Sequence, residues 1–315
     1  MFAVSRDMTR PLLTSVGSLP VMEDTSVQRS IELFCDLQRD LRFDVFTDGE
    51  PRNDMIGYFL SGIEGLGVLR GRPSITGRVR SPQDIDAFSK IVDLKYLERC
   101  IHLRGIEGTA KVALTGPITL GFTCALGNLG PYSSIRDPRL YQDTSSALLP
   151  IVQRVQKLGA ITQIDEPGLS AGFMEPASST KYLQVITGEL KQPKTIVHVC
   201  GRITPNLSRA LLSLENVDTL SLAFASQPEN VKVITRQQLL SSRKNIAAGC
   251  ARVDVAEIGD TDKANEIALT IEAVKTSFGQ ELISYVHPDC GLRRTPLEIA
   301  KTILANVSIA TSTAQ

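Results

Sequence analysis

The chain has 315 residues, enough for one large barrel or two modest domains with a sizeable buried core. Its 34 Lys and Arg residues balance 34 Asp and Glu residues, which argues against a basic face for nucleic acid and against an acidic tail. No apolar run approaches the roughly 20 residues that cross a bilayer, and the N-terminus lacks the features of a signal peptide. The six scattered cysteines are typical of a reducing compartment, so we expect a cytoplasmic protein that acts on a small molecule, with no membrane or nucleic-acid partner.

Short runs rich in β-branched residues alternate with longer stretches of helical periodicity. The predicted strands cover residues 12–18, 43–49, 111–117, 160–166, 195–201, 219–225, 245–253 and 283–289. The predicted helices cover residues 24–40, 81–93, 137–149, 204–214, 261–275 and 295–307. Ser, Thr or Asp opens each helix, as N-cap chemistry requires. The alternation predicts an α/β fold, a (β/α)8 TIM barrel that forms a single domain over residues 1–315.

An open doubly wound sheet is the alternative fold. That fold normally has a Gly-rich phosphate turn after its first strand, and the GxGxxG pattern is absent from this chain. The segment 52–80 interrupts the alternation after the second predicted strand, with several glycines and a basic end. We predict that this segment is an insertion over one end of the barrel, either a hairpin or a lid.

Two segments in the second half of the chain, VHVCG (197–201) and HPDCG (287–291), contain the most reactive side chains. They place His198, Cys200 and Cys290 at the ends of two predicted strands. The i, i+2 spacing directs His198 and Cys200 to the same side of their strand. An imidazole and two thiolates are ligands that Zn²⁺ selects, and three protein ligands leave a position free for a substrate. A core histidine beside a buried cysteine is the alternative for the first two residues.

Further polar residues follow the ends of the predicted strands, which meet at one face of a barrel where active sites are found. These residues are Ser18, Asp48, Glu50, Asp165, Glu166 and Asp289. The carboxylates of DEPG (165–168) can bind a substrate ammonium or act as general acid or base, and a helix cap or exposed turn is the alternative. In SVGSLP (15–20), backbone N–H groups near Gly17 suit a carboxylate.

Six segments in chain order resemble the motif series of the C-terminal catalytic domain of cobalamin-independent methionine synthase. They are SVGSLP, TDGEPRNDMIGYF, GPITL, QIDEPGL, VHVCGR and HPDCGLRR, and the resemblance runs from about residue 12 to about residue 307. That family folds as a (β/α)8 barrel and uses zinc to activate the thiol of homocysteine for methylation.

The resemblance implies roles for seven residues. It implies that His198, Cys200 and Cys290 bind zinc, that Gly17 and Ser18 lie near the amino-acid carboxylate, and that Glu50 and Asp165 are catalytic residues directed toward the ammonium of the substrate.

The chain differs from that family in three respects. It lacks the large N-terminal barrel of the full-length enzymes and is similar to the short core form found mainly in archaea and some bacteria. It has no Trp, on which the full-length enzymes stack their folate, and this favours methylcobalamin or another methylated corrinoid, free or on a corrinoid protein, as methyl donor. On its sixth predicted strand, Ala223 stands where the family has a glutamate as fourth zinc ligand.

We therefore predict a zinc-dependent methyltransferase that moves a methyl group to the thiol of homocysteine and forms methionine. One alternative is zinc-dependent alkyl transfer to another thiol such as coenzyme M, because a three-ligand His/Cys/Cys site resembles that of the enzymes that alkylate coenzyme M. The other alternative is a non-catalytic barrel homologue.

Overall fold

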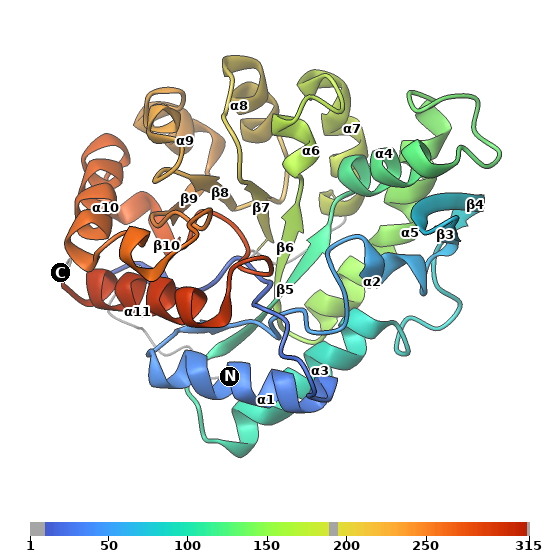
Figure 1. Ribbon diagram of the computed structural model, residues 1–315. Helices are drawn as coiled ribbons and strands as arrows, with labels where there is room; N and C mark the ends of the chain where they lie inside the picture. The colour runs from blue at the N-terminus through green and yellow to red at the C-terminus, as the bar shows by residue number, and fades with distance from the viewer. Residues whose placement is uncertain (1–9, 189–194, 314–315) are drawn as a thin grey trace.

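The computed structural model describes residues 10–188 and 195–313, and eight parallel strands within them form a barrel with helices around it (Figure 1). The strands are β1 (Leu12–Leu13), β2 (Val45–Phe46), β5 (Thr109–Thr115), β6 (Ile161–Asp165), β7 (Thr195–Val199), β8 (Thr219–Ala223), β9 (Asn245–Gly249) and β10 (Ile283–His287). Hydrogen-bonded neighbours follow the order β1-β10-β9-β8-β7-β6-β5-β2. A parallel bridge between Ser18 and Gly49 joins the segments that follow β1 and β2. The predicted TIM barrel is confirmed.

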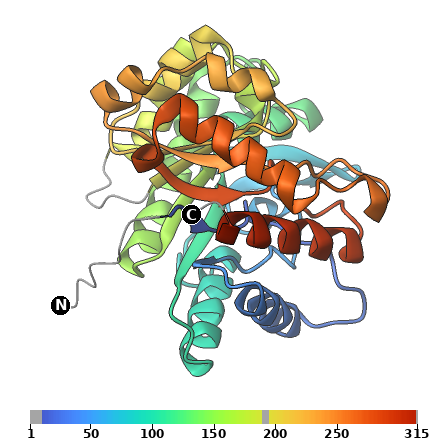
Figure 2. The same cartoon turned by 90° about the vertical axis from the view of Figure 1, so that its left-hand side faces the viewer.

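Helices cover the outside of the barrel. The longer ones are α1 (Val27–Asp40), α3 (Ser89–Leu103), α4 (Pro117–Gly127), α5 (Pro138–Lys157), α7 (Pro176–Thr187), α8 (Pro205–Leu212), α9 (Arg236–Ser242), α10 (Ala264–Phe278) and α11 (Leu297–Thr313), and α2 (Gly57–Leu60) and α6 (Pro167–Ser170) are short. Figure 2 shows α11, in dark red, beside α1, in blue, and Ser308 Oγ donates a hydrogen bond to the carbonyl oxygen of Leu41 at 2.7 Å. No helix in the described ranges has the length and apolar character needed to cross a membrane.

Some of the helices begin at the N-cap residues predicted from the sequence, and others do not. The side chains of Asp137 and Thr204 accept hydrogen bonds from backbone N–H groups at the starts of α5 and α8, as predicted. The predicted start at residue 81 is wrong, because Asp84 Oδ1 accepts from the N–H groups of Asp86 and Ala87 and forms a turn there. Helices α4, α7 and α9 lie where the sequence predicts no helix; α4 is buried over most of its surface and has no amphipathic stripe.

Successive side chains of each strand point alternately to the barrel interior and to the surrounding helices. Val197 and Val199 of β7 belong to the large core between the barrel and the helices. Ile196 belongs to a second, smaller cluster whose buried members all come from strands, so it faces the barrel interior. His198 has the same parity as Ile196 and therefore also points inward, above this apolar floor.

The predicted insertion contains an antiparallel hairpin of β3 (Glu64–Leu69) and β4 (Arg72–Arg80). Figure 1 shows it at the rim of the barrel next to α4 and α5. Ile75 N donates to the carbonyl oxygen of Asn128 at 3.2 Å, and Val79 N donates to Tyr132 Oη at 3.0 Å. These bonds attach the hairpin to the segment between α4 and α5. That 52–80 acts as a lid, and that the chain is a single domain, stay predictions.

Candidate active site

A cavity of about 600 Å³ opens at the C-terminal ends of the strands. Six of the seven residues to which the resemblance assigns roles line it: Ser18, Glu50, Asp165, His198, Cys200 and Cys290. Gly17 lies between the lining residues Val16 and Ser18, and its carbonyl oxygen accepts a hydrogen bond from Thr47 Oγ1 at 3.1 Å. The barrel therefore brings the predicted site residues together, although they come from five separate parts of the chain.

His198, Cys200 and Cys290 form a compact group of ligand atoms, all within 4.8 Å of one another. His198 Nε2 is buried and has no hydrogen-bond partner among the described residues, whereas Nδ1 lies 2.8 Å from Ser221 Oγ. A buried nitrogen without a partner beside two thiols is the arrangement that a metal ion completes. These residues therefore fit the zinc ion that the resemblance implies.

Cys200 and Cys290 can both be thiolates only if a nearby cation compensates their charges. A hydrogen bond with Cys200 and burial both raise the pKa of Cys290 above its ordinary value. Two adjacent thiolates repel each other, so they do not coexist in a buried site without a positive charge. A bound Zn²⁺ deprotonates coordinating thiols and removes this obstacle.

Ala223, which the resemblance aligns with a fourth zinc ligand, lies at the end of β8 and is fully buried. The nearby carboxylate of Asp289 is used elsewhere: it accepts hydrogen bonds from the backbone N–H groups of Phe224, Ala225 and Ser226. Within the described ranges, the candidate metal group thus has three members, and Asp289 holds the loop after β8.

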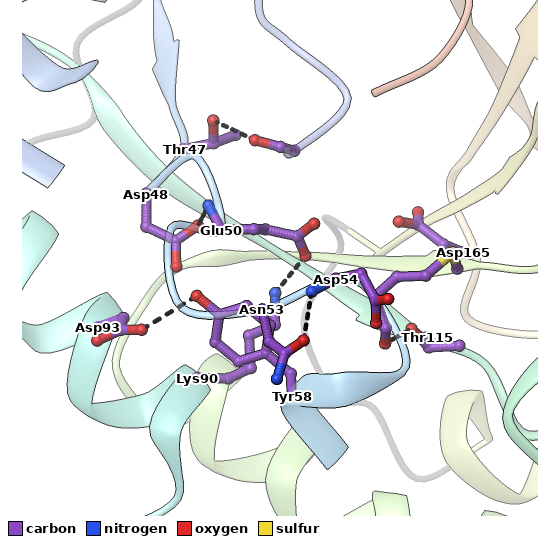
Figure 3. Close-up of polar contacts among 12 residues, drawn as sticks. Thr47, Asp48, Glu50, Asn53, Asp54, Tyr58, Lys90, Asp93, Thr115 and Asp165 are labelled. Atoms are coloured by element: carbon purple, nitrogen blue, oxygen red, sulfur yellow. Dashed lines mark hydrogen bonds and ion pairs between the residues drawn. The ribbon is translucent and has the colours of Figure 1, made fainter. Parts of the chain in front are cut away.

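Glu50 is held by a buried cation that the sequence did not indicate. Its backbone has a φ of 54°, in the left-handed region, and its N–H donates to Asp48 Oδ1 at 3.1 Å. Its carboxylate forms an ion pair with Lys90 of α3, a side chain that is only 1% exposed and lies over the ring of Tyr58 (Figure 3). Burial opposes the charged form of Lys90, but the charges of Glu50 and Asp48 outweigh it and raise the pKa of Lys90.

One carboxylate oxygen of Asp165 accepts a hydrogen bond from a neighbouring side chain, and the other is directed to the cavity. Gln163 Nε2 donates to Asp165 Oδ1 at 2.7 Å, and Gln163 Oε1 accepts from the buried Lys111 Nζ at 2.8 Å, which sets the orientation of the amide. Asp165 Oδ2 has no hydrogen-bond partner in the part of the chain that the structure describes. Asp165 is the register partner of His198 on β7, so its free oxygen lies beside the candidate metal group.

Glu166, the second carboxylate of DEPG, has a different environment from Asp165. It is fully buried and points away from the cavity, where it accepts hydrogen bonds from Ile118 N, Thr119 N and Thr119 Oγ1 at 2.6–2.9 Å. It therefore caps the N-terminus of α4, so the helix-cap alternative for the DEPG carboxylates holds for Glu166. Gly116 permits this contact, because a Cβ there would lie 2.2 Å from Glu166 Oε1.

We expect the Glu166→Gln variant to lose about 1–3 kcal/mol of unfolding free energy, because at least one buried N–H of α4 loses its acceptor. Its zinc content should equal that of the wild-type protein. Denaturant unfolding and metal analysis measure the two quantities. Unchanged stability together with lost zinc would contradict a capping role.

Arg293 is another residue of the site that sequence reasoning missed. Its Nη1 donates to the carbonyl oxygen of Glu50 at 2.8 Å and so connects the segment after β10 to the loop after β2. Its place in HPDCGLRR, three residues after Cys290, was the available signal. For Lys90 there was none, since a lysine in a predicted helix is normally solvated.

A family model described as the catalytic domain of cobalamin-independent synthase matches residues 9–313. The chain belongs to this family. A methionine synthase from Methanothermobacter marburgensis is 30% identical to this chain, and the match covers 85% of this chain and 84% of the relative. A methionine synthase from Methanocaldococcus jannaschii is 26% identical, and that match covers 95% of this chain and 98% of the relative. A B12-independent methionine synthase structure from Shewanella sp. W3-18-1, in complex with selenomethionine, superposes with a TM-score of 0.72 at 19% identity, covering 96% of this chain and 97% of that chain.

The family description corrects one expectation. A cobalamin-independent family is at odds with the predicted methylcobalamin or corrinoid donor and with a corrinoid protein as partner. The expectation depended on the absence of Trp, but one missing residue type removes only one way of stacking a flat donor and does not select another donor. Neither the corrinoid nor its carrier protein enters the proposed reaction.

Proposed function

We propose that this chain is a zinc-dependent methyltransferase that forms methionine by methylating the thiol of homocysteine. The observation that carries the proposal is the placement of His198, Cys200 and Cys290 beside the free oxygen of Asp165 in one cavity. The family match, and the methionine synthases among the relatives, support the same reaction.

His198 Nε2 and the Sγ atoms of Cys200 and Cys290 would hold the zinc ion. Zinc supplies a Lewis acid that lowers the pKa of a bound thiol, so the acceptor sulfur is a thiolate near neutral pH. Asp165 Oδ2 accepts a hydrogen bond from the substrate ammonium, and backbone groups at Gly17 and Ser18 receive its carboxylate.

The remaining residues orient the acceptor for transfer. Lys90 compensates the charge of Glu50, so Glu50 acts mainly as a polar residue of the cavity lining. Asp165 provides the negative charge that no cation among the described residues pairs with inside the site. Met55, Ile56 and Val253 line the cavity with apolar surface, which suits the methyl-bearing end of a donor. In the transfer the acceptor sulfur forms a bond to the methyl carbon, while the bond to the donor breaks and its electron pair stays with the donor.

One observation favours a second acceptor. With Ala223 in place of a carboxylate, the metal group carries less negative charge and has more open space, as in a site for coenzyme M. The unpaired carboxylate of Asp165 opposes this alternative, because coenzyme M has a sulfonate in place of an amino-acid ammonium.

The zinc-loaded protein should bind homocysteine with release of a proton near pH 7, and coenzyme M at least about tenfold more weakly, since it lacks the charge-assisted bond to Asp165. Calorimetric titration in buffers of different ionisation enthalpy measures affinity and proton release together. Tighter binding of coenzyme M would support the second acceptor. No thiol binding at all by a zinc-loaded protein would indicate a non-catalytic homologue.

A further inference from the structure

A line of three hydrogen bonds runs through the barrel interior behind His198. His198 Nδ1 lies 2.8 Å from Ser221 Oγ on β8, and Ser221 Oγ lies 2.8 Å from His287 Nε2 at the end of β10. His287 Nδ1 ends the line, 2.6 Å from the carbonyl oxygen of Pro288. All three side chains are at most 2% exposed, so water does not compete for these bonds.

The sequence of the strand between β8 and β10 makes this contact possible. Strand β9 presents only Ala247 and Gly249 next to Ser221 and His287 in the sheet register. With no large side chain between them, Ser221 and His287 reach each other across β9.

The chemistry of the last acceptor sets the direction of every bond in the line. The carbonyl oxygen of Pro288 only accepts, so Nδ1 of His287 carries its hydrogen. His287 is only 1% exposed and its two ring nitrogens contact a hydroxyl and a carbonyl oxygen, so burial favours the neutral ring and its Nε2 accepts from the hydroxyl of Ser221. The single hydroxyl hydrogen of Ser221 is then used, so Ser221 Oγ accepts from Nδ1–H of His198.

We propose that Ser221 and His287 are positioning residues that fix the tautomer of His198 and direct its Nε2 lone pair to the metal. The inference rests on the zinc site of the proposed function and identifies the side chains that prepare it. Histidine ligands of zinc usually donate their second N–H to a carboxylate, a carbonyl or water. Here a hydroxyl and a second imidazole connect that N–H to a backbone carbonyl.

The Ser221→Ala variant removes the first acceptor, and we expect its zinc affinity to fall about 10- to 100-fold. Competition with a chromophoric chelator measures the affinity. Ser145→Ala is the matched control, because Ser145 is equally buried but donates its hydroxyl hydrogen to the carbonyl oxygen of Tyr141 in α5. The control should bind zinc like the wild-type protein. Less than a threefold loss in a folded Ser221→Ala protein would overturn the proposal.

A second measurement needs neither a variant nor zinc. The chain has three histidines, and His102 is exposed, so the NMR spectrum of protein labelled with ¹⁵N-histidine resolves the tautomers of His198 and His287. We expect the Nδ1–H tautomer for both rings in the zinc-free protein. An Nε2–H tautomer of His198 would contradict the proposed direction of the hydrogen bonds and overturn the proposal. If the wild-type protein bound no zinc, the proposed function would fail, while these tautomers would still test the hydrogen-bond line.

Discussion

Replacing Cys200 by alanine, or Cys290 by serine, is expected to abolish zinc binding and methyl transfer together. Each thiol belongs to a candidate metal group that has three members among the described residues, and Ala223 supplies no further ligand. Lewis-acid activation contributes several kcal/mol to such reactions, so the methylation rate should fall by about 10³-fold or more. Metal analysis of the purified variants, together with a methionine-formation assay, measures both losses.

Cys35→Ala is the control for this experiment. Cys35 is buried in α1 and does not line the cavity, and burial raises its pKa to about 11, so it stays a thiol. This variant should keep its zinc. The two ligand variants should keep a native far-UV circular dichroism spectrum, because the large apolar core does not depend on the metal group. Wild-type zinc stoichiometry in both ligand variants would exclude these thiols as ligands.

The Asp165→Asn variant is expected to raise the KM for homocysteine roughly 100-fold, since a lost charge-assisted bond in a buried site costs about 2–3 kcal/mol. The substitution keeps the shape of the side chain and removes the charge that faces the substrate ammonium. Its zinc content should equal that of the wild-type protein, and its unfolding free energy should change little, whereas Glu166→Gln lowers the unfolding free energy. Steady-state kinetics with homocysteine as the varied substrate measure the effect.

Two comparisons make the Asp165 experiment specific. The deaminated analogue 4-mercaptobutanoate should bind the variant and the wild-type protein equally, because it has no ammonium. Glu50→Gln should change the KM less than Asp165→Asn but lower the stability more, because it removes the ion-pair partner of the buried Lys90 and leaves only the charge of Asp48 near it. If Asp165→Asn weakened homocysteine and its deaminated analogue equally, Asp165 would not be the ammonium partner.

The fold could be predicted from the sequence because its signals are local. Each predicted strand is a short run that contains β-branched residues, and alternation with helices is enough to indicate a barrel. The missed helix α4 shows the limit of this reasoning. It is buried on most sides, so its sequence lacks the polar face that marks a helix.

The candidate metal group could also be predicted, because it depends on residue type and on the ends of two strands. The i, i+2 spacing of His198 and Cys200 directs both to one side, and Cys290 ends the last strand. The two carboxylates of DEPG were harder to separate. Adjacent residues at a strand end point to opposite faces, and only the register of β6 shows that Asp165 faces the cavity and Glu166 faces α4.

The amino-acid sequence by itself therefore determined the barrel, the residue types of the candidate metal group and their location at one end of the strands. Only the tertiary structure decided which side chains support them: Lys90 behind Glu50, Gln163 behind Asp165, and Ser221 with His287 behind His198. The reason is physical. A strand end is encoded by neighbouring residues, whereas a buried polar group takes its partner from whichever strand or helix the closed barrel places against it.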